Sequence, residues 1–278
     1  MDKILTFIKR HKLIISVTLA VLIALLVWSN IYLDVNTHTV SSAALPDSFD
    51  GFRIAHISDL HNAELGNDNS RLIKKLREAS PNIIAITGDS VDYFYTDFEC
   101  VLVFIEQAVK IAPCYYVTGN HEAWIGAFNL KGFEAKLTDL GVTVLHNESI
   151  MLERGGEYIY LAGIDDPDCG GDYRKNLEKV SDSDCFTVLL SHRPELFEEY
   201  VKNGFDLVLS GHAHGGQFRL PLIGGLLAPN QGWFPKYDSG IYSEGSTNMV
   251  VSRGIGNSVV PVRINNPSEL IIIELKKQ

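Results

Sequence analysis

Cysteine is scarce in this chain, and the few cysteines do not form a metal-binding or redox motif. The 278 residues include four of them, at positions 100, 114, 169 and 185. No two follow the C-x-x-C spacing, which excludes a zinc knuckle and a thioredoxin-like redox pair. We interpret the four thiols as small buried apolar side chains, and a disulfide among them stays an alternative.

Basic residues are also few. Lys and Arg number 24 against 34 Asp and Glu, which gives a formal net charge of −10. A general nucleic-acid-binding protein normally presents a basic face, so this balance argues against nucleic acid as a partner. A phosphorylated substrate is compatible with the charge, because bound divalent cations reverse the local field. Hydrophobic residues make up 46% of the chain, which suits one large globular domain with an appendage.

Charge is absent from one long stretch near the amino terminus. Residues 13–33 contain no charged side chain, and a helix of this length spans the roughly 30 Å of hydrocarbon in a bilayer. Basic residues precede the stretch, whereas none follows it before Arg53, so the positive-inside rule places the amino terminus in the cytoplasm. We therefore interpret residues 1–33 as a cytoplasmic stub and a single-pass anchor in the cell membrane, with the main domain extracytoplasmic. A cleaved signal peptide, whose apolar core is shorter, and a buried core helix are the alternatives.

Polar residues 34–50 are interpreted as a linker to a domain over residues 51–278. In that domain, short apolar runs alternate with amphipathic segments, which predicts βαβ units and a largely parallel sheet of the α/β class. The expected strands cover residues 52–58, 82–87, 114–118, 142–145, 158–164, 186–190, 206–210, 249–252 and 270–275. The expected helices cover residues 69–79, 97–109, 129–140, 173–180 and 195–202.

Polar side chains of a particular kind follow five of these expected strands. In doubly wound α/β folds the carboxyl ends of the strands meet at one edge of the sheet, where ligands bind. We therefore expect the five turns to bring their side chains to one place. The side chains are Asp59 and His61, Asp89 and Asp92, Asn120 and His121, His192, and His212 and His214.

Carboxylate, amide oxygen and imidazole are donors that suit manganese, iron or zinc ions. No thiolate is among them, which excludes a structural cysteine-based zinc site. Seven candidate ligands are too many for one ion and suit two divalent ions that share a bridging carboxylate. Taken singly, each residue also has a structural explanation as a turn residue, a helix cap or a hydrogen-bonded histidine. The seven candidates are Asp59, His61, Asp89, Asn120, His192, His212 and His214.

The order of these motifs resembles the calcineurin-like metallophosphoesterases. D-x-H at residues 59–61, G-D-x-x-D at 88–92, G-N-H-E at 119–122, His192 and G-H-A-H at 211–214 match the blocks of that family in order. The turn GHAHGGQ, the anchor and the tail motifs S-R-G-I-G at 252–256 and P-V-R at 261–263 look most like the YkuE/YaeI-type branch of bacterial phosphodiesterases.

The resemblance implies a fold and a set of ligands. The implied fold is a two-layer β-sandwich flanked by helices, with two metal ions at the edge of the sheets. By the same resemblance, Asp59, His61 and His214 would hold one ion. Asn120, His192 and His212 would hold the other, and Asp89 would bridge the two.

The expected reaction is hydrolysis of a phosphoester. A hydroxide between the two ions attacks phosphorus, and His121 protonates the leaving oxygen as the general acid. Asp92 is the expected partner that orients His121 and favours its charged form. The protein Ser/Thr phosphatases of the superfamily have Arg-Gly after the second Asp of G-D-x-x-D, whereas Tyr93 and Phe94 follow Asp92 here. A phosphodiester or pyrophosphate is therefore favoured over a phosphomonoester.

The anchor points to a substrate at the membrane. A tethered domain meets lipid head groups at high effective concentration, so a lipid or a lipid-linked nucleotide is one expected substrate. The apolar loop at residues 220–228 is interpreted as an acyl-chain groove or a bilayer contact, and packing into the core is the alternative. For the whole protein, the alternatives are a phosphomonoesterase and an inactive, anchored metal-binding or sensor module.

Overall fold

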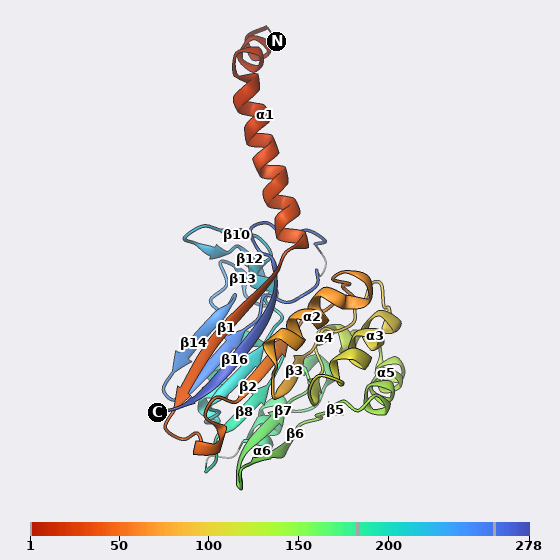
Figure 1. The fold of residues 1–278 in the computed structure, drawn as a ribbon, viewed down its shortest axis with the longest axis vertical. Coiled ribbons are helices and arrows are strands. Elements are labelled where there is room, and N and C mark those ends of the chain that lie inside the picture. Colours follow the sequence, from red (N-terminus) through yellow and green to blue (C-terminus); the bar gives the residue numbers. More distant parts are fainter. Residues whose placement is uncertain (1, 182–183, 258–259) are drawn as a thin grey trace.

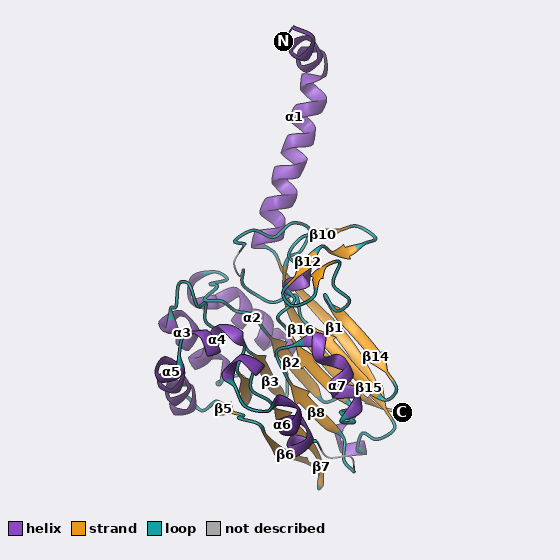
Figure 2. Ribbon diagram, turned by 180° about the vertical axis from the view of Figure 1, so that it is seen from behind, coloured by secondary structure: helices purple, strands orange, loops and turns teal. Residues whose placement is uncertain are grey.

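Two six-stranded β-sheets pack face to face in the computed structural model, with helices on both outer surfaces (Figure 1, Figure 2). The structure describes residues 2–181, 184–257 and 260–278. In spatial order, the first sheet consists of β1 (Leu33–Ser42), β16 (Ser268–Lys277), β2 (Arg53–Ile57), β3 (Ile83–Thr87), β4 (Cys114–Val117) and β5 (Thr143–Val144). The second sheet consists of β14 (Gly240–Glu244), β15 (Thr247–Val251), β9 (Leu207–Ser210), β8 (Thr187–Leu190), β7 (Glu157–Gly163) and β6 (Glu148–Arg154).

Apolar side chains fill both the space between the sheets and the space under the helices. Along β3, Ile83 and Ala85 belong to the core between the sheets, whereas Ile84 and Ile86 belong to the core under the helices. Successive side chains of a strand point to opposite faces, so a strand that is covered on both faces is apolar throughout. This is why the central strands read as continuous apolar runs in the sequence.

Helices cover the two outer surfaces of the sandwich. Side chains of α2 (Ser70–Ala79), α3 (Phe98–Ala108) and α5 (Ala127–Asp139) pack on the first sheet. Side chains of α6 (Tyr173–Val180) and α7 (Phe197–Lys202) pack on the second. The two-layer β-sandwich flanked by helices is therefore confirmed as the fold.

Strand direction places the carboxyl ends of several strands at one end of the sandwich. In the first sheet, β2, β3 and β4 run parallel to one another. In the second sheet, β7, β8, β9 and β15 run parallel. The loops that leave the carboxyl ends of these strands, including the short α4 (Asn120–Trp124), therefore form the functional edge.

The segment at residues 34–50 is not the linker that its polar composition suggested. Most of it forms β1, which pairs in parallel with β16 from Leu33 opposite Ser268 to Ser42 opposite Lys277. β1 lies next to one strand only, and an edge strand with a solvated side accommodates polar side chains that resemble a loop in the sequence. The backbone hydrogen bonds to β16, rather than apolar burial, define this strand.

One long helix, α1 (Asp2–Ile31), extends away from the sandwich (Figure 1). Residues 11–31 are long and apolar enough to cross a membrane, with a mean hydropathy of 2.4. The end of the helix is fixed to the domain, because Asn30 and the Arg263 backbone exchange two hydrogen bonds and Ser29 Oγ accepts from the Asn265 N–H. Only Tyr32 separates α1 from β1.

Three further expectations need correction. Residues 220–228, interpreted above as an apolar loop, lie in two hairpins, that of β10 (Arg219–Leu220) and β11 (Gly224–Gly225) and that of β12 (Leu227–Ala228) and β13 (Gly232–Trp233). The strands β6 and β14 were not expected at all. The four cysteines are free thiols, so none forms the disulfide left open above, and the expectation that all four are buried holds for Cys114 alone: Cys100 and Cys185 are half-buried and Cys169 is exposed.

Candidate metal centre

The turns that follow five strands, three in one sheet and two in the other, meet at the functional edge. Asp59 and Asp89 follow β2 and β3, and Asn120 follows β4. From the opposite sheet, His192 follows β8 and His212 follows β9. The two sets touch, because the His212 N–H donates to the Asp59 carboxylate at 3.1 Å. The two sheets thus build one site between them.

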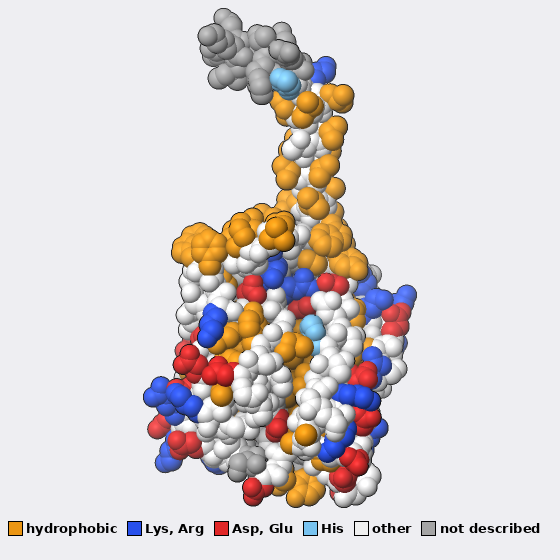
Figure 3. Space-filling model, turned by 90° about the vertical axis from the view of Figure 1, so that its left-hand side faces the viewer, with side chains coloured by type: hydrophobic (Ala, Val, Ile, Leu, Met, Phe, Trp, Pro, Cys, Tyr) orange, Lys and Arg blue, Asp and Glu red, His pale blue; other side chains and the backbone are white. Residues whose placement is uncertain are grey.

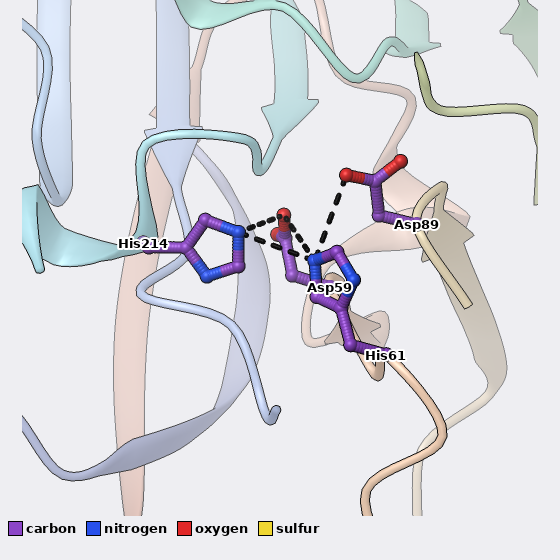
Figure 4. A group of neighbouring side chains, drawn as sticks. All are labelled: Asp59, His61, Asp89 and His214. Atoms are coloured by element: carbon purple, nitrogen blue, oxygen red, sulfur yellow. Dashed lines mark hydrogen bonds and ion pairs between the residues drawn. The ribbon is translucent and has the colours of Figure 1, made fainter. Parts of the chain in front are cut away.

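A first group of donors comprises Asp59, His61, Asp89 and His214, all buried (Figure 4). His214 Nε2 lies 3.3 Å from Asp59 Oδ1 and 3.2 Å from His61 Nε2. His61 Nε2 lies 3.6 Å from Asp89 Oδ2. Ligand atoms about 2.0–2.2 Å from a common ion lie roughly 3–4 Å from one another, so these separations fit one ion.

A second group comprises Asp89, His192 and His212. Asp89 Oδ2 lies 3.2 Å from His192 Nε2, which in turn lies 3.2 Å from His212 Nδ1. The same Asp89 Oδ2 atom also lies near His61 in the first group. One carboxylate oxygen is shared by two groups of candidate ligands.

Asn120 supplies a separate test of whether a cation fits here. Its side chain is buried, and its Oδ1 atom has no hydrogen-bond partner among the described residues. A buried polar atom without a partner costs about 1–3 kcal/mol. A cation bound to this oxygen would remove that cost, so the residue set fits a metal site.

The electrostatics of the site point the same way. Burial alone would raise the pKa of the Asp89 carboxyl, but the His192 and His61 rings outweigh it and hold the pKa well below its usual value. Burial would lower the pKa of His192, but Asp89 outweighs it and raises the pKa to about 10. Burial instead raises the pKa of the Asp59 carboxyl and lowers those of the His212 and His214 rings. At Asp89, protonated His192 and His61 thus neutralise the carboxylate. Divalent cations would take over this role and displace the protons.

Backbone conformation is unusual at the same residues. Asp59, His61, Asp89, His212 and His214 all have positive φ, between 44° and 62°. Such angles are uncommon for residues other than glycine and cluster at functional sites, where surrounding structure maintains them. At these left-handed turns the backbone leaves the direction of the strand, and the side chains of the turns come together in the two groups of donors.

Gly211 shows how closely these turns approach each other. A Cβ atom at this position would lie 1.8 Å from Ser58 Oγ and 2.2 Å from Asp59 Oδ2. We expect Gly211→Ala to displace Asp59 and to lower metal content, measured by elemental analysis of the purified protein. Gly132→Ala is the matched control, because a Cβ there meets nothing within 4 Å. Full metal content in Gly211→Ala would show that the tight approach does not matter.

His121 and Asp92 are close, but they are not partners in the expected way. Asp92 Oδ2 lies 3.6 Å from His121 Nδ1 and 3.5 Å from His61 Nδ1, both too long for a good hydrogen bond. The His121 Nδ1 atom instead accepts a hydrogen bond from the Tyr93 N–H at 2.9 Å. The neutral His121 ring therefore carries its proton on Nε2. Burial lowers the pKa of His121, contrary to the charged form expected from Asp92.

Glu122 was quoted in the G-N-H-E motif but given no role, and the structure shows one. Its buried carboxylate accepts backbone N–H groups of Asp89 at 2.7 Å, Ser90 at 2.6 Å and Gly119 at 2.9 Å. Burial, reinforced by the Asp89 charge, raises the pKa of Glu122 to about 7. Glu122 thus fixes the turns after β3 and β4 to each other, and its position beside His121 was the available signal.

Arg193 is a second residue that sequence reasoning missed. Its buried guanidinium donates to Asp166 through Nε and Nη2, pairs with Asp168 at 3.1 Å, and places Nη1 3.0 Å from His212 Nε2. The Trp124 indole N–H donates to Asp168 at 2.9 Å. This chain of contacts encloses the His212 side of the site. The signal was a pair of aspartates directly after the expected strand at 158–164.

A cavity of about 600 Å³ opens beside the first group. His61 and Asp92 line its floor, and Phe94, Tyr95 and Pro261 contribute apolar walls. The aromatic side chains of Phe94 and Tyr95 are largely exposed. The cavity is thus polar beside the donors and apolar farther out, which suits a phosphoester that carries a bulky or apolar group.

Comparisons with known proteins agree with this geometry. The model of the family described as calcineurin-like phosphoesterase matches residues 52–216. An uncharacterized metallophosphoesterase, YkuE of Bacillus subtilis, is 31% identical and covers 88% of this chain and 86% of its own length. Phosphodiesterase YaeI of Escherichia coli is 27% identical and covers 84% and 85%. A transmembrane protein with a metallophosphoesterase domain from Danio rerio is 30% identical and covers 84% and 55%.

Among solved structures, TT1561 of Thermus thermophilus superposes with a TM-score of 0.50 at 13% identity, over 73% of this chain and 89% of that one, a likeness of fold alone. The family match spans more than half of the chain and contains the seven candidate ligands. Together with the relative from Bacillus subtilis, it shows that this chain belongs to the calcineurin-like phosphoesterase family.

Proposed function

We propose that this protein is a two-metal-dependent phosphodiesterase. The observation that carries the proposal is the shared oxygen: Asp89 Oδ2 lies 3.6 Å from His61 Nε2 and 3.2 Å from His192 Nε2. One oxygen between two groups of donors suits a pair of ions about 3.5–4 Å apart. Manganese, iron and zinc all suit a mixture of imidazole, carboxylate and amide oxygen.

The two groups of donors suggest how the ligands divide. Asp59, His61 and His214 would hold one ion. His192 and His212 would hold the other, joined by the unpartnered Oδ1 of Asn120. Asp89 would contact both ions.

Bound ions would supply Lewis acidity and lower the pKa of the water that attacks phosphorus. The chain itself contributes His121, which follows the ligand Asn120 directly. In the neutral ring Nδ1 accepts from the Tyr93 N–H, so Nε2 is the nitrogen left free to donate. To protonate the leaving oxygen as the general acid, the ring must first take up a proton at Nδ1, which breaks the bond from Tyr93 and gives imidazolium. Arg193 keeps the His212 ring in place, and Glu122 fixes the backbone of the turns.

Two features favour a diester over a monoester. Tyr93 and Phe94 occupy the positions at which phosphoprotein phosphatases of the superfamily have Arg-Gly, so the arginine that would grip a terminal phosphate is missing there. The cavity beside His61 has room and apolar walls for a second ester group. The name of the relative YaeI, a phosphodiesterase, supports the same choice.

We further propose that α1 anchors the protein in the cell membrane and that the substrate is a lipid or lipid-linked phosphoester. The length and apolarity of residues 11–31 support the anchor. Relatives from Danio rerio and Bos taurus are named transmembrane proteins with the same kind of domain. The basic residues before the helix favour a cytoplasmic amino terminus, with the catalytic domain outside.

A pair of chromogenic substrates tests the activity. After removal of metal and addition of manganese, we expect hydrolysis of bis-p-nitrophenyl phosphate to exceed that of p-nitrophenyl phosphate by about tenfold or more in kcat/KM. A faster monoester reaction would make the protein a phosphomonoesterase. Two bound manganese ions without turnover of either compound would favour the inactive metal-binding or sensor module.

A further inference from the structure

Exposed apolar side chains surround the point at which α1 meets the domain (Figure 3). They come from the two hairpins β10–β11 and β12–β13, which lie beside the end of α1 in Figures 1 and 2. Leu222 is fully exposed, and Trp233 is 71% exposed. Packing of residues 220–228 into the core, the alternative left open above, is therefore wrong for Leu222, Ile223 and Leu227, which are all exposed. We call this surface the apolar rim; it comprises Leu220, Leu222, Ile223, Leu227, Trp233 and Phe234.

The apolar rim and α1 form one continuous structure. The Arg219 N–H donates to the Ile264 carbonyl at 3.0 Å, and Asn265 Nδ2 donates to the Arg219 carbonyl at 3.3 Å. The Asn265 N–H in turn donates to Ser29 Oγ of α1 at 2.9 Å. Ile264 is itself half exposed. The first hairpin is thus fixed to the last turn of α1 through Ile264 and Asn265.

Charge in this region differs from charge in the rest of the chain. The protein has a formal net charge of −10, yet residues 217–236 contain no Asp or Glu. Of the two basic residues in this range, Arg219 pairs with Asp238 at 3.0 Å, and Lys236 is exposed. A large exposed apolar surface costs free energy in water, about 25 cal/mol per Å². Exposed aromatic and aliphatic side chains with little charge among them are typical of surfaces that lie in the interface of a bilayer.

We propose that the apolar rim docks onto the same bilayer that α1 crosses, with Leu222, Ile223, Trp233 and Phe234 at the boundary between head groups and acyl chains. The proposal rests on the proposed anchoring by α1 and does not require phosphoesterase activity. α1 fixes the position of one point of the domain, and the rim supplies the second contact that sets its tilt. The domain then contacts the membrane surface through the rim as well as through α1.

Docking determines which end of the sandwich meets the lipid. The metal turn is bonded to the rim, because the Leu226 N–H donates to the Gly216 carbonyl at 3.1 Å. The His214 carbonyl accepts from Asn266 Nδ2 at 2.7 Å, one residue beyond the contact with α1. The functional edge therefore faces the bilayer, and the substrate class that it can reach is a phosphoester in the head-group region.

Intrinsic fluorescence of the full chain in lipid nanodiscs tests the docking. The protein has three tryptophans, Trp28 in α1, Trp124 at the site and Trp233 in the rim. The Trp233 signal is obtained as the difference between wild type and Trp233→Phe. In nanodiscs whose acyl chains are brominated near the head group, we expect this signal to be quenched roughly twofold or more, because bromine quenches only indoles within the apolar layer.

Two surface variants give the matched comparison. In Leu222→Asp with Ile223→Asp, two exposed residues become acidic, and we expect most of the quenching of Trp233 to disappear. Met151→Asp alters an exposed apolar residue on β6, at the end of the domain far from α1, and should leave the quenching unchanged (Figure 1). Neither change touches a buried side chain, so both proteins should fold.

The Trp28 signal, obtained from Trp28→Phe, separates this proposal from the anchor itself. Quenching of Trp28 without quenching of Trp233, and with Trp233 open to aqueous iodide, would overturn the docking while the anchor stands. Absence of quenching at Trp28 would overturn both. A Trp233 shielded from both bromine and iodide in a dimeric chain would assign the rim to a second copy and overturn docking onto lipid.

Discussion

Asp89→Asn is expected to lower kcat/KM for bis-p-nitrophenyl phosphate by about a thousandfold or more, corresponding to roughly 4 kcal/mol of transition-state stabilisation. The carboxylate lies between the two groups of donors, and its neutral amide counterpart has the same shape without the charge. We also expect metal content to fall from two ions per chain to one or fewer. Elemental analysis measures this independently of turnover.

The matched control is Asp172→Asn. Asp172 caps α6 by accepting the Lys175 N–H, and asparagine caps helices about as well as aspartate. This variant should therefore keep both ions and full activity. Two ions per chain and activity within a few-fold of wild type in Asp89→Asn would contradict the shared-oxygen arrangement. Thermal unfolding of the metal-free proteins checks that the altered chain is folded.

Replacement of His121 by alanine should leave both ions in place and slow diester hydrolysis by roughly a hundredfold or more, the typical contribution of a general acid. His121 contributes no atom to either group of donors that includes Asp89. It belongs to a third cluster with His61 and Asp92, but its Nδ1 atom already accepts from the Tyr93 N–H, so metal content should not change. Loss of metal from the alanine variant would contradict the proposed role of His121.

Phosphodiesters with different leaving groups distinguish a general acid from a structural residue. A proton donor matters most when the departing oxygen is strongly basic, so the alanine variant should lose more activity on an alkyl aryl phosphodiester that expels the alkoxide than on one that expels p-nitrophenolate. A purely structural role for His121 would slow both reactions by the same factor. Alanine at Tyr93 is the matched control, because the Tyr93 backbone N–H that bonds His121 remains.

Much of the candidate site could be predicted from the sequence because topology alone fixes where strand ends lie. Asp59, Asp89 and His192 each follow an apolar run of a parallel strand directly, so their positions at one edge follow from the alternation of strands and helices. Contacts between side chains from different sheets were harder to predict from the sequence. That Asp89 contacts both His61 and His192 depends on how two layers pack, which the resemblance to a family implied and periodicity did not.

The sequence did not reveal the roles of residues that act through contacts with residues far away in the chain. Arg193 follows His192 in the chain, but its role beside His212 depends on Asp166 from another strand end. The hydrogen bond from Tyr93 to His121 comes from the backbone, which no side-chain pattern can report. β1 was missed for a related reason, because its stability comes from backbone pairing with β16.

The single residue between α1 and β1 has a consequence for kinetics. With Tyr32 as the only residue between them, and with Asn30 and Ser29 bonded to the domain, the functional edge cannot swing out to sample the surrounding solution once α1 is in a bilayer. The lipid phosphoester that we propose as substrate would then arrive by lateral diffusion within the leaflet. Turnover should follow the surface mole fraction of the phosphoester, so that diluting it with inert lipid slows the reaction even when its total amount in the sample stays the same.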